Sequence, residues 1–229
     1  EFQAIIKLEP NHLKSLYEIA LAYRDLNKFD LALNYCSQIF KIDPNHSQSI
    51  LLAIKIRKLT CDWSCYEKDF LYTLKRINAD EESLGPFSSL SFFKDPAIQN
   101  KTSETYARKY NPNNLFNKIP PYKNHKKIRI AYFSPDFYIH PVSNLIVELI
   151  ENHDKSKFEI YGFSLVEWPD DPVNKRLKKA FTKYINVENK PTKDIVRLAR
   201  EMEIDITIDL AVYTGKNRPE IFAMRTAPI

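Results

Sequence analysis

The 229-residue sequence predicts α-helical repeats followed by an α/β domain with an incomplete, doubly wound parallel sheet. Two observations predict this fold class. A proline-containing segment recurs after 34 residues near the amino terminus, and strand-like and helix-like segments alternate after residue 127. We expect four parts: repeats at 1–60, a helical connecting region at 61–110, a linker at 111–127 and an incomplete α/β lobe at 128–229.

The recurring segment is IKLEPNH at residues 6–12 and FKIDPNH at residues 40–46. Between the copies, two helix-period apolar stripes flank a break at residues 27–28, and small Ala20 and Ala32 stand where the helices must approach closely. This 34-residue period resembles the tetratricopeptide repeat. A third copy begins at Ser49, but Arg57 takes the place of Tyr23 and the pattern then leaves the repeat. We expect two and a half repeats here and further repeats upstream.

Residues 61–110 are expected to be mainly helical, with helices near residues 66–77 and 103–110 and a loop at residues 84–87. Prolines and five asparagines at residues 111–127 are typical of a linker.

After the linker, strand-like segments at residues 128–133, 158–163, 184–187 and 204–210 alternate with amphipathic helices. The pair Asp171-Pro172 is typical of a helix start, and a last helix is expected at residues 220–224. Strands that alternate with helices predict a parallel sheet with helical crossovers, which is a Rossmann-like arrangement. We expect a fifth strand to begin where the sequence stops, and we interpret the chain as a piece of a longer protein.

The composition argues against several classes of protein. Only three glycines are present (Gly85, Gly162 and Gly215), so neither of the common glycine-rich phosphate loops can be formed. The net charge of +5 is spread along the chain and does not favour nucleic-acid binding. Three cysteines without a CxxC pair indicate neither a disulfide framework nor a zinc site. With no membrane span and no signal peptide in the sequence, we expect a cytoplasmic protein.

Candidate site residues follow two strands, because ligands of open parallel sheets bind beyond the carboxyl ends of the strands. Asp136 and His140 follow the first strand, and Arg218 follows the fourth. His140 can relay a proton or donate a hydrogen bond, with Asp136 orienting its ring, and Arg218 can hold an anionic or carbonyl group. Each also has a structural interpretation: the histidine can anchor its loop, the aspartate can cap a turn, and the arginine can pair with a surface carboxylate.

The same loops resemble a known family. KIRIAYFSPDF at residues 127–137, followed by His140-Pro141, is similar to the opening of the catalytic region of the protein O-GlcNAc transferases. Tyr213-Thr214, Arg218 and the segment RTAPI at residues 225–229 resemble a later family motif, and Cys61-Asp62-Trp63 resembles a block between the repeats and the catalytic region.

The resemblance implies the first lobe of a two-lobed GT-B enzyme behind a repeat array. Such an enzyme transfers N-acetylglucosamine from UDP-GlcNAc to serine or threonine of proteins with inversion, without metal or cofactor. It implies catalytic roles for His140 and Asp136 and substrate contacts for Pro141, Tyr213, Thr214 and Arg218. It also implies that acceptor proteins bind the repeats. The family binds UDP mostly through its second lobe, so we expect these 229 residues alone to be inactive.

Several positions differ from the family pattern: Val142 replaces a hydroxyl residue, Asn144 and Phe87 replace histidines, and Ala211-Val212 replaces Asn-Gly. Two alternatives therefore stay open. One is a repeat scaffold with a degenerate transferase lobe, and the other is a glucose-transferring relative that acts on asparagine.

Overall fold

In a computed structural model, the chain folds into two compact units, Glu1–Tyr106 and Ala107–Ile229. The structure describes residues 2–81, 83–110, 119, 122 and 125–229. Most of the predicted linker at 111–127 therefore lies outside the described residues. No helix among the described residues is long and apolar enough to cross a lipid bilayer.

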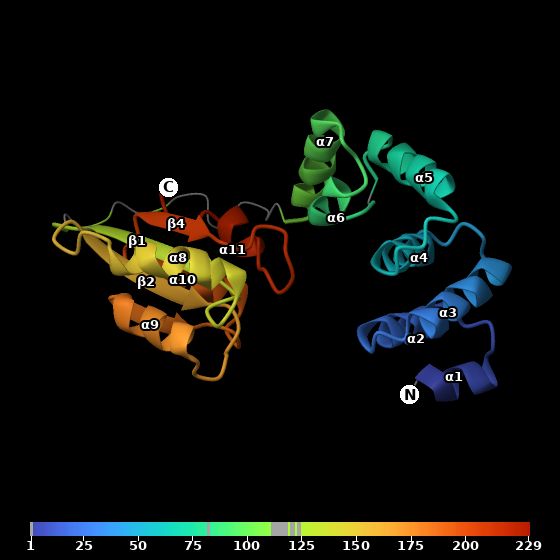
Figure 1. Cartoon of the computed structure of the whole chain (residues 1–229), viewed down its shortest axis with the longest axis horizontal. Coiled ribbons are helices and arrows are strands. Elements are labelled where there is room, and N and C mark those ends of the chain that lie inside the picture. Colours follow the sequence, from blue (N-terminus) through green and yellow to red (C-terminus); the bar gives the residue numbers. More distant parts are fainter. Residues whose placement is uncertain (1, 82, 111–118, 120–121, 123–124) are drawn as a thin grey trace. The chain divides into compact units, whose positions relative to one another are not determined.

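The first unit is entirely helical in its described part (Figure 1). Its helices are α1 (Phe2–Leu8), α2 (Leu13–Asp25), α3 (Phe29–Ile42), α4 (Ser47–Leu59), α5 (Tyr66–Asn78), α6 (Pro86–Leu90) and α7 (Pro96–Ala107), which ends at the boundary between the units. The 3₁₀ helix η1 (Arg108–Tyr110) follows at the start of the second unit. Ala20 and Ala32 are fully buried between α2 and α3, as the spacing of small residues predicts.

A histidine begins the first helix of each of two successive pairs. His12 Nδ1 accepts the backbone N–H of Ser15 at 3.2 Å at the start of α2, and His46 Nδ1 accepts that of Ser49 at 3.4 Å at the start of α4. Each serine hydroxyl also lies 2.8 Å from the same ring nitrogen. The histidine of the recurring PNH segment is therefore a helix cap, which satisfies backbone donors that have no partner within the helix.

One position distinguishes the two helix pairs. In the first pair, the rings of Tyr23 on α2 and Tyr35 on α3 stack with centroids 5.5 Å apart. The residues 34 positions later are Arg57 on α4 and Asp69 on α5, which form a two-point ion pair with N–O distances of 2.5 and 2.8 Å. The predicted replacement of Tyr23 by Arg57 is thus matched by a second replacement on the partner helix. The pairing pattern extends to α5, beyond the point where the apolar pattern leaves the repeat.

Two predictions for the connecting region differ from the structure. The segment expected as a loop at residues 84–87 begins the short helix α6 at Pro86. The helix expected at residues 103–110 starts earlier, at Pro96, because the Asp95 carboxylate accepts the Ala97 N–H at 2.8 Å. Asp95-Pro96 is the same start signal that Asp171-Pro172 gives in the second unit.

The second unit is a four-stranded parallel sheet in the order β3-β2-β1-β4. Its strands are β1 (Ile128–Ser134), β2 (Phe158–Ser164), β3 (Lys183–Asn186) and β4 (Ile206–Asp209), and its helices are α8 (Pro141–Glu151), α9 (Pro172–Ala180), α10 (Thr192–Glu201) and α11 (Glu220–Ala223). The alternation of strands and helices that the sequence predicts is confirmed, and only the ends of some elements shift by a few residues.

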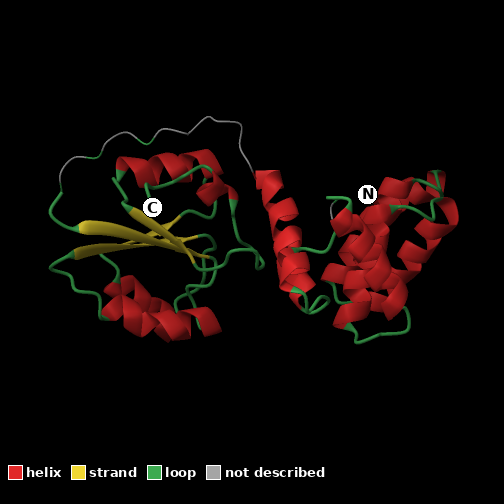
Figure 2. Cartoon of the chain, turned by 90° about the horizontal axis from the view of Figure 1, so that it is seen from above, coloured by secondary structure: helices red, strands yellow, loops and turns green. Residues whose placement is uncertain are grey.

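Helices cover both faces of this sheet (Figure 2). Val147 of α8 and Leu177 of α9 pack with Ile130 and Tyr132 of β1 on one face. Residues of α10 and α11 pack with Ala131 and Phe133 on the other. The alternate side chains of β1 thus enter two separate cores, which makes the fold doubly wound.

The outer edge of β4 is bonded to Ile229. Ile229 N–H donates to Asp205 O at 3.1 Å, and Thr207 N–H donates to Ile229 O at 2.8 Å. This is the slanted hydrogen-bond pattern of parallel strands, so Ile229 lies where the first residue of a fifth strand would pair.

The Arg57–Asp69 pair gives a first prediction. Asp69→Ala is expected to lower the free energy of unfolding of the helical unit by about 3 kcal/mol, because it leaves a mostly buried guanidinium without its partner. The double variant Arg57→Tyr/Asp69→Tyr, which reinstates the aromatic pair, should recover most of this loss. Urea unfolding followed by circular dichroism measures both.

The control is Asp25→Ala, which breaks the exposed Arg24–Asp25 pair and should cost about 0.5 kcal/mol or less. Equal destabilisation by Asp69→Ala and by the double variant would contradict the equivalence of the two pairs.

Candidate functional site

The strand order reverses at β1, since β2 and β3 lie on one side of it and β4 lies on the other. The loops that follow β1 and β4 therefore leave the sheet in different directions at its carboxyl edge. In open α/β sheets, this is where ligands bind. All six predicted site residues lie on these two loops or at the start of α8, on residues 135–141 and 210–219.

The first loop is held by its neighbours at alternate residues. The indole N–H of Trp168 donates to Pro135 O at 2.5 Å, the amide of Asn174 donates to Phe137 O at 2.5 Å, and the Asp171 carboxylate accepts Ile139 N–H at 2.8 Å. All three partners belong to the segment between β2 and the first turn of α9. The backbone of the loop is thus fixed from one side at every second residue.

The residues between these tethers are Asp136, Tyr138 and His140. The His140 ring lies 5.3 Å from the Tyr138 ring, and its Nδ1 is 3.8 Å from an Asp136 carboxylate oxygen. The His140 side chain is 30% exposed and that of Asp136 is 17% exposed, so both are reachable from solvent. Pro141 is the first residue of α8. The structure therefore brings together the three residues predicted after the first strand.

His140 is also the N-cap of α8, because its Nδ1 accepts the Val142 N–H at 3.3 Å. This confirms the structural interpretation of the histidine as a residue that anchors its loop. Because Nδ1 is an acceptor, the neutral ring has its proton on Nε2. In this arrangement His140 can donate a hydrogen bond to a substrate atom. At 3.8 Å, the Asp136 oxygen is beyond hydrogen-bond distance of Nδ1.

The second loop is organised by Asp209, which is not among the predicted site residues. Its carboxylate at the end of β4 accepts the N–H groups of Ala211 at 2.9 Å and Val212 at 3.0 Å. Thr214 is exposed and its hydroxyl donates to Ala211 O at 2.9 Å, while Tyr213 is half-buried. An aspartate at the last position of an apolar strand was the signal that could have found it.

Arg218 is bonded to the loop between β3 and α10. Its guanidinium donates to Lys190 O at 2.9 Å and to the Thr192 hydroxyl at 2.6 Å. These contacts tie the β4–α11 loop to its neighbour, and the predicted substrate contact of Arg218 stays a prediction.

The predicted site residues also do not include Trp168, Tyr138 and Lys216, which contact one another. The Tyr138 and Trp168 rings stack with centroids 4.1 Å apart, and Lys216 Nζ lies 4.6 Å from the centre of the Trp168 ring. These three residues come from the loops after β1, β2 and β4. Tyr138 lies within the motif at residues 134–141, but for Trp168 and Lys216 only the position after a strand could have indicated a role.

A charged cluster at the opposite, amino edge of the sheet has a structural role. Arg129 bonds to Glu159 at 3.0 Å and to Glu203 at 3.2 Å, and His125 Nε2 lies 2.7 Å from Asp205. A hydrogen bond from the Tyr161 hydroxyl, together with Arg129, holds the pKa of the Glu159 carboxyl below its usual range. The carboxylates here are paired within the fold.

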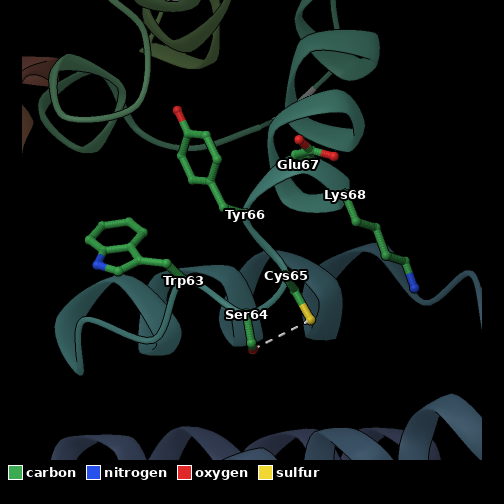
Figure 3. A pocket seen from close by; sticks show the side chains of 6 residues that line it. All are labelled: Trp63, Ser64, Cys65, Tyr66, Glu67 and Lys68. Atoms are coloured by element: carbon green, nitrogen blue, oxygen red, sulfur yellow. Dashed lines mark hydrogen bonds between the residues drawn. The ribbon is translucent and has the colours of Figure 1, made fainter.

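A large depression in the helical unit, of about 860 Å³, is lined by residues 63–68 (Figure 3). Trp63 and Tyr66 project to one side of it and Lys68 to the other. One continuous segment lines it, so no groups from different elements converge there. In the core of the helical unit, burial raises the pKa of the Cys36 thiol to about 11, which makes it a poor nucleophile at neutral pH. Among the described residues, no three His, Cys, Asp or Glu side chains form a group that could hold a metal.

Comparison with known proteins identifies the family of this chain. A family model described as Glycosyl transferase family 41 matches residues 107–229, more than half of the chain. The chain belongs to glycosyl transferase family 41. The match covers the α/β unit with both site loops, and the expected resemblance to the O-GlcNAc transferases is confirmed.

Two relatives of this chain are both named as peptide N-acetylglucosaminyltransferases. It is 27% identical over 158 residues to the probable UDP-N-acetylglucosamine–peptide N-acetylglucosaminyltransferase SEC of Arabidopsis thaliana, covering 64% of this chain and 16% of that protein. It is 31% identical over 109 residues to the UDP-N-acetylglucosamine–peptide N-acetylglucosaminyltransferase of Caenorhabditis elegans, covering 47% and 9%. The chain therefore spans less than a fifth of the length of these relatives.

The fold is similar to that of a Thermobaculum terrenum O-GlcNAc transferase mutant, with a TM-score of 0.66 and 20% identity. The similarity covers 100% of this chain and 45% of that one. Helical repeats followed by a partial GT-B lobe, the predicted fold class, are thereby confirmed.

Asp171 gives a second prediction, because its two carboxylate oxygens serve different elements. One oxygen caps α9 through the N–H groups of Val173 and Asn174, and the other accepts Ile139 N–H. Asp171→Ala is expected to cost about 1 kcal/mol of stability and to speed hydrogen exchange of the Ile139 amide. Urea unfolding and amide exchange by NMR measure the two effects.

Asp170→Ala is the matched control, because the neighbouring Asp170 pairs only with Lys178 at an exposed position among the contacts described. It should leave the Ile139 amide unchanged. Protection of that amide in Asp171→Ala at the level of the unmodified chain would contradict the tether.

Proposed function

We propose that this chain forms the acceptor-side part of an inverting protein glycosyltransferase that transfers N-acetylglucosamine from UDP-GlcNAc to serine or threonine hydroxyls of proteins. The main support is the position of Asp136 and His140, at the carboxyl end of the inner strand β1 and beside the reversal of strand order. The names of the relatives, which specify UDP-N-acetylglucosamine as donor and peptides as acceptors, support the substrate class.

An inverting transfer requires an acceptor hydroxyl to attack the anomeric carbon on the face opposite the departing UDP. In the arrangement observed, His140 would donate an Nε2–H hydrogen bond to an oxygen of the sugar or the acceptor. Asp136 would become a direct partner of Nδ1 if the two groups approached by about 1 Å, to hydrogen-bond distance. That exchange would release the Val142 N–H and turn Nε2 into a proton acceptor. The same residue pair could thus serve either as a donor or as a base.

The second site loop would complete the acceptor side. Thr214 and Tyr213 are placed at the same edge of the sheet by Asp209, and Arg218 would support them through its bonds to the β3–α10 loop. We propose substrate contacts for Pro141, Tyr213, Thr214 and Arg218, with no metal or cofactor in the mechanism. The sequence has no Asp-x-Asp pair at a strand end of the sort that holds a metal beside a nucleotide sugar.

The helical unit would recognise acceptor proteins. Its 34-residue period, with a histidine cap at the same place in each pair, supports tetratricopeptide repeats, whose stacks present grooves to peptides. Three free cysteines, Cys36, Cys61 and Cys65, are compatible with the proposed cytoplasmic location.

The third prediction concerns the donor. These 229 residues alone are expected to bind UDP more weakly than micromolar and to transfer no sugar, because diphosphate recognition would come from the second lobe of the family. Isothermal titration calorimetry with UDP measures this. A micromolar dissociation constant for UDP with these residues alone would contradict the assignment of UDP binding to the second lobe.

The fourth prediction tests the activity itself in the full-length natural polypeptide that contains these residues. His140→Asn should lower the rate of transfer from UDP-GlcNAc to an acceptor peptide by about a hundredfold or more. Asparagine is a good N-cap, so α8 should keep its stability while the imidazole donor is lost.

Acceptor-peptide binding in His140→Asn should stay intact, which separates chemistry from recognition. Full-length protein that binds peptides but transfers neither N-acetylglucosamine nor glucose would instead favour the scaffold alternative. Transfer of glucose to asparagine would favour the second alternative, a glucose-transferring relative that acts on asparagine.

A further inference from the structure

Four side chains form a continuous row across the carboxyl edge of the sheet. Lys216 lies over the Trp168 ring, Trp168 stacks on Tyr138, and Tyr138 lies against the His140 ring, with separations of 4.6, 4.1 and 5.3 Å. The row begins on the β4–α11 loop, passes through the β2–α9 loop and ends on the β1–α8 loop. It joins the two loops that hold the predicted site residues other than Pro141, which begins α8.

Trp168 is fixed at its edge as well as at its faces. Its indole N–H donates to Pro135 O at 2.5 Å, which sets the rotation of the ring relative to the loop that follows β1. A stacked tyrosine at 4.1 Å fills one face of the ring, so the Lys216 ammonium lies over the other. With both faces in use, Trp168 is not available as a platform for a sugar ring.

The His140 ring is held from two directions. The Val142 N–H fixes its Nδ1, and the Tyr138 ring packs beside it. The remaining ring nitrogen, Nε2, is the atom that the proposed function requires at the substrate. Its direction therefore depends on Tyr138, and the direction of Tyr138 depends on Trp168.

We propose that Trp168 is a positioning residue, which through Tyr138 sets the direction of the His140 imidazole and through Lys216 ties the Tyr213–Thr214 turn to the same assembly. The part that concerns catalysis rests on the proposed function. The coupling between the loops is a property of the fold, and it can be measured without an assay of transferase activity.

The first arm of the test uses NMR of the 229-residue chain with labelled histidine, in which His140→Gln identifies the His140 ring signals. Trp168→Leu removes both the stack and the indole N–H, while Trp168→Phe retains a ring and loses only the N–H. Both should move the His140 ring signals, and Trp168→Leu should move them more, because the ring current of Tyr138 acts over short distances. Lys216→Met, at an exposed position, should shift them least and should also move the Thr214 amide signal.

Trp63→Phe is the matched control, since it makes the same substitution at the exposed tryptophan of the helical unit. It should leave the His140 signals in place. Unchanged His140 signals in both Trp168 variants, with the chain folded, would overturn the proposal. Should Trp168→Leu not fold, Trp168→Phe and Lys216→Met still decide it.

The second arm measures transfer in the full-length polypeptide. Trp168→Phe and Trp168→Leu should lower kcat by about tenfold or more with little change in KM for the donor, because a misdirected catalytic group affects the chemical step. Displaced His140 signals with unchanged kcat would overturn the positioning role. If His140→Asn itself leaves transfer unchanged, the proposed function fails, and the NMR arm alone still decides the coupling of the loops.

Discussion

Strand β1 must be bonded along both edges and buried on both faces, and the arrangement of the α/β unit follows from this constraint. Its alternate residues enter two cores, so α8 and α9 cover one face and α10 and α11 cover the other. Its two edges pair with β2 and β4, so the strand order reverses beside it. The chain that leaves β1 at Ser134 therefore emerges at the centre of the sheet, between loops that arrive from both sides. The strand order alone therefore determines where the site lies, whatever side chains the loops carry.

Most of the fold can be predicted from the sequence because its signals are local. Alternating and helix-period apolar residues, together with Asp171-Pro172, give the order of strands and helices in the second unit. The 34-residue spacing gives the first helix pair. The early start of α7 could be predicted from Asp95-Pro96 by the same rule, whereas the pairing of Arg57 with Asp69 could not, because a charged pair in place of two tyrosines leaves no apolar pattern to follow.

The candidate site could be predicted only in part. The motif at residues 134–141 identifies Asp136 and His140 but leaves open whether the histidine anchors its loop or acts on a substrate. Only the fold shows that its Nδ1 accepts the Val142 N–H, which decides what the ring can do. Trp168 lies 28 positions from His140 and in a different loop, so only the folded sheet brings it to the Tyr138 ring. For Arg218 the sequence indicates a substrate contact or a pair with a surface carboxylate, whereas the fold bonds its guanidinium to a backbone carbonyl and a threonine hydroxyl.

The paired replacement at Tyr23/Tyr35 and Arg57/Asp69 has a consequence for how such a repeat array can change during evolution. Within each helix pair, the two contacting residues form one compatible set, so the loop between the two helices is a poor crossover point. A recombination there would place an arginine against a tyrosine, or a tyrosine against a buried carboxylate. Crossovers in the PNH segments between pairs keep each set intact. Gene duplication and chimera construction should therefore succeed at those boundaries, and the inheritable unit of this array is the helix pair together with its histidine cap.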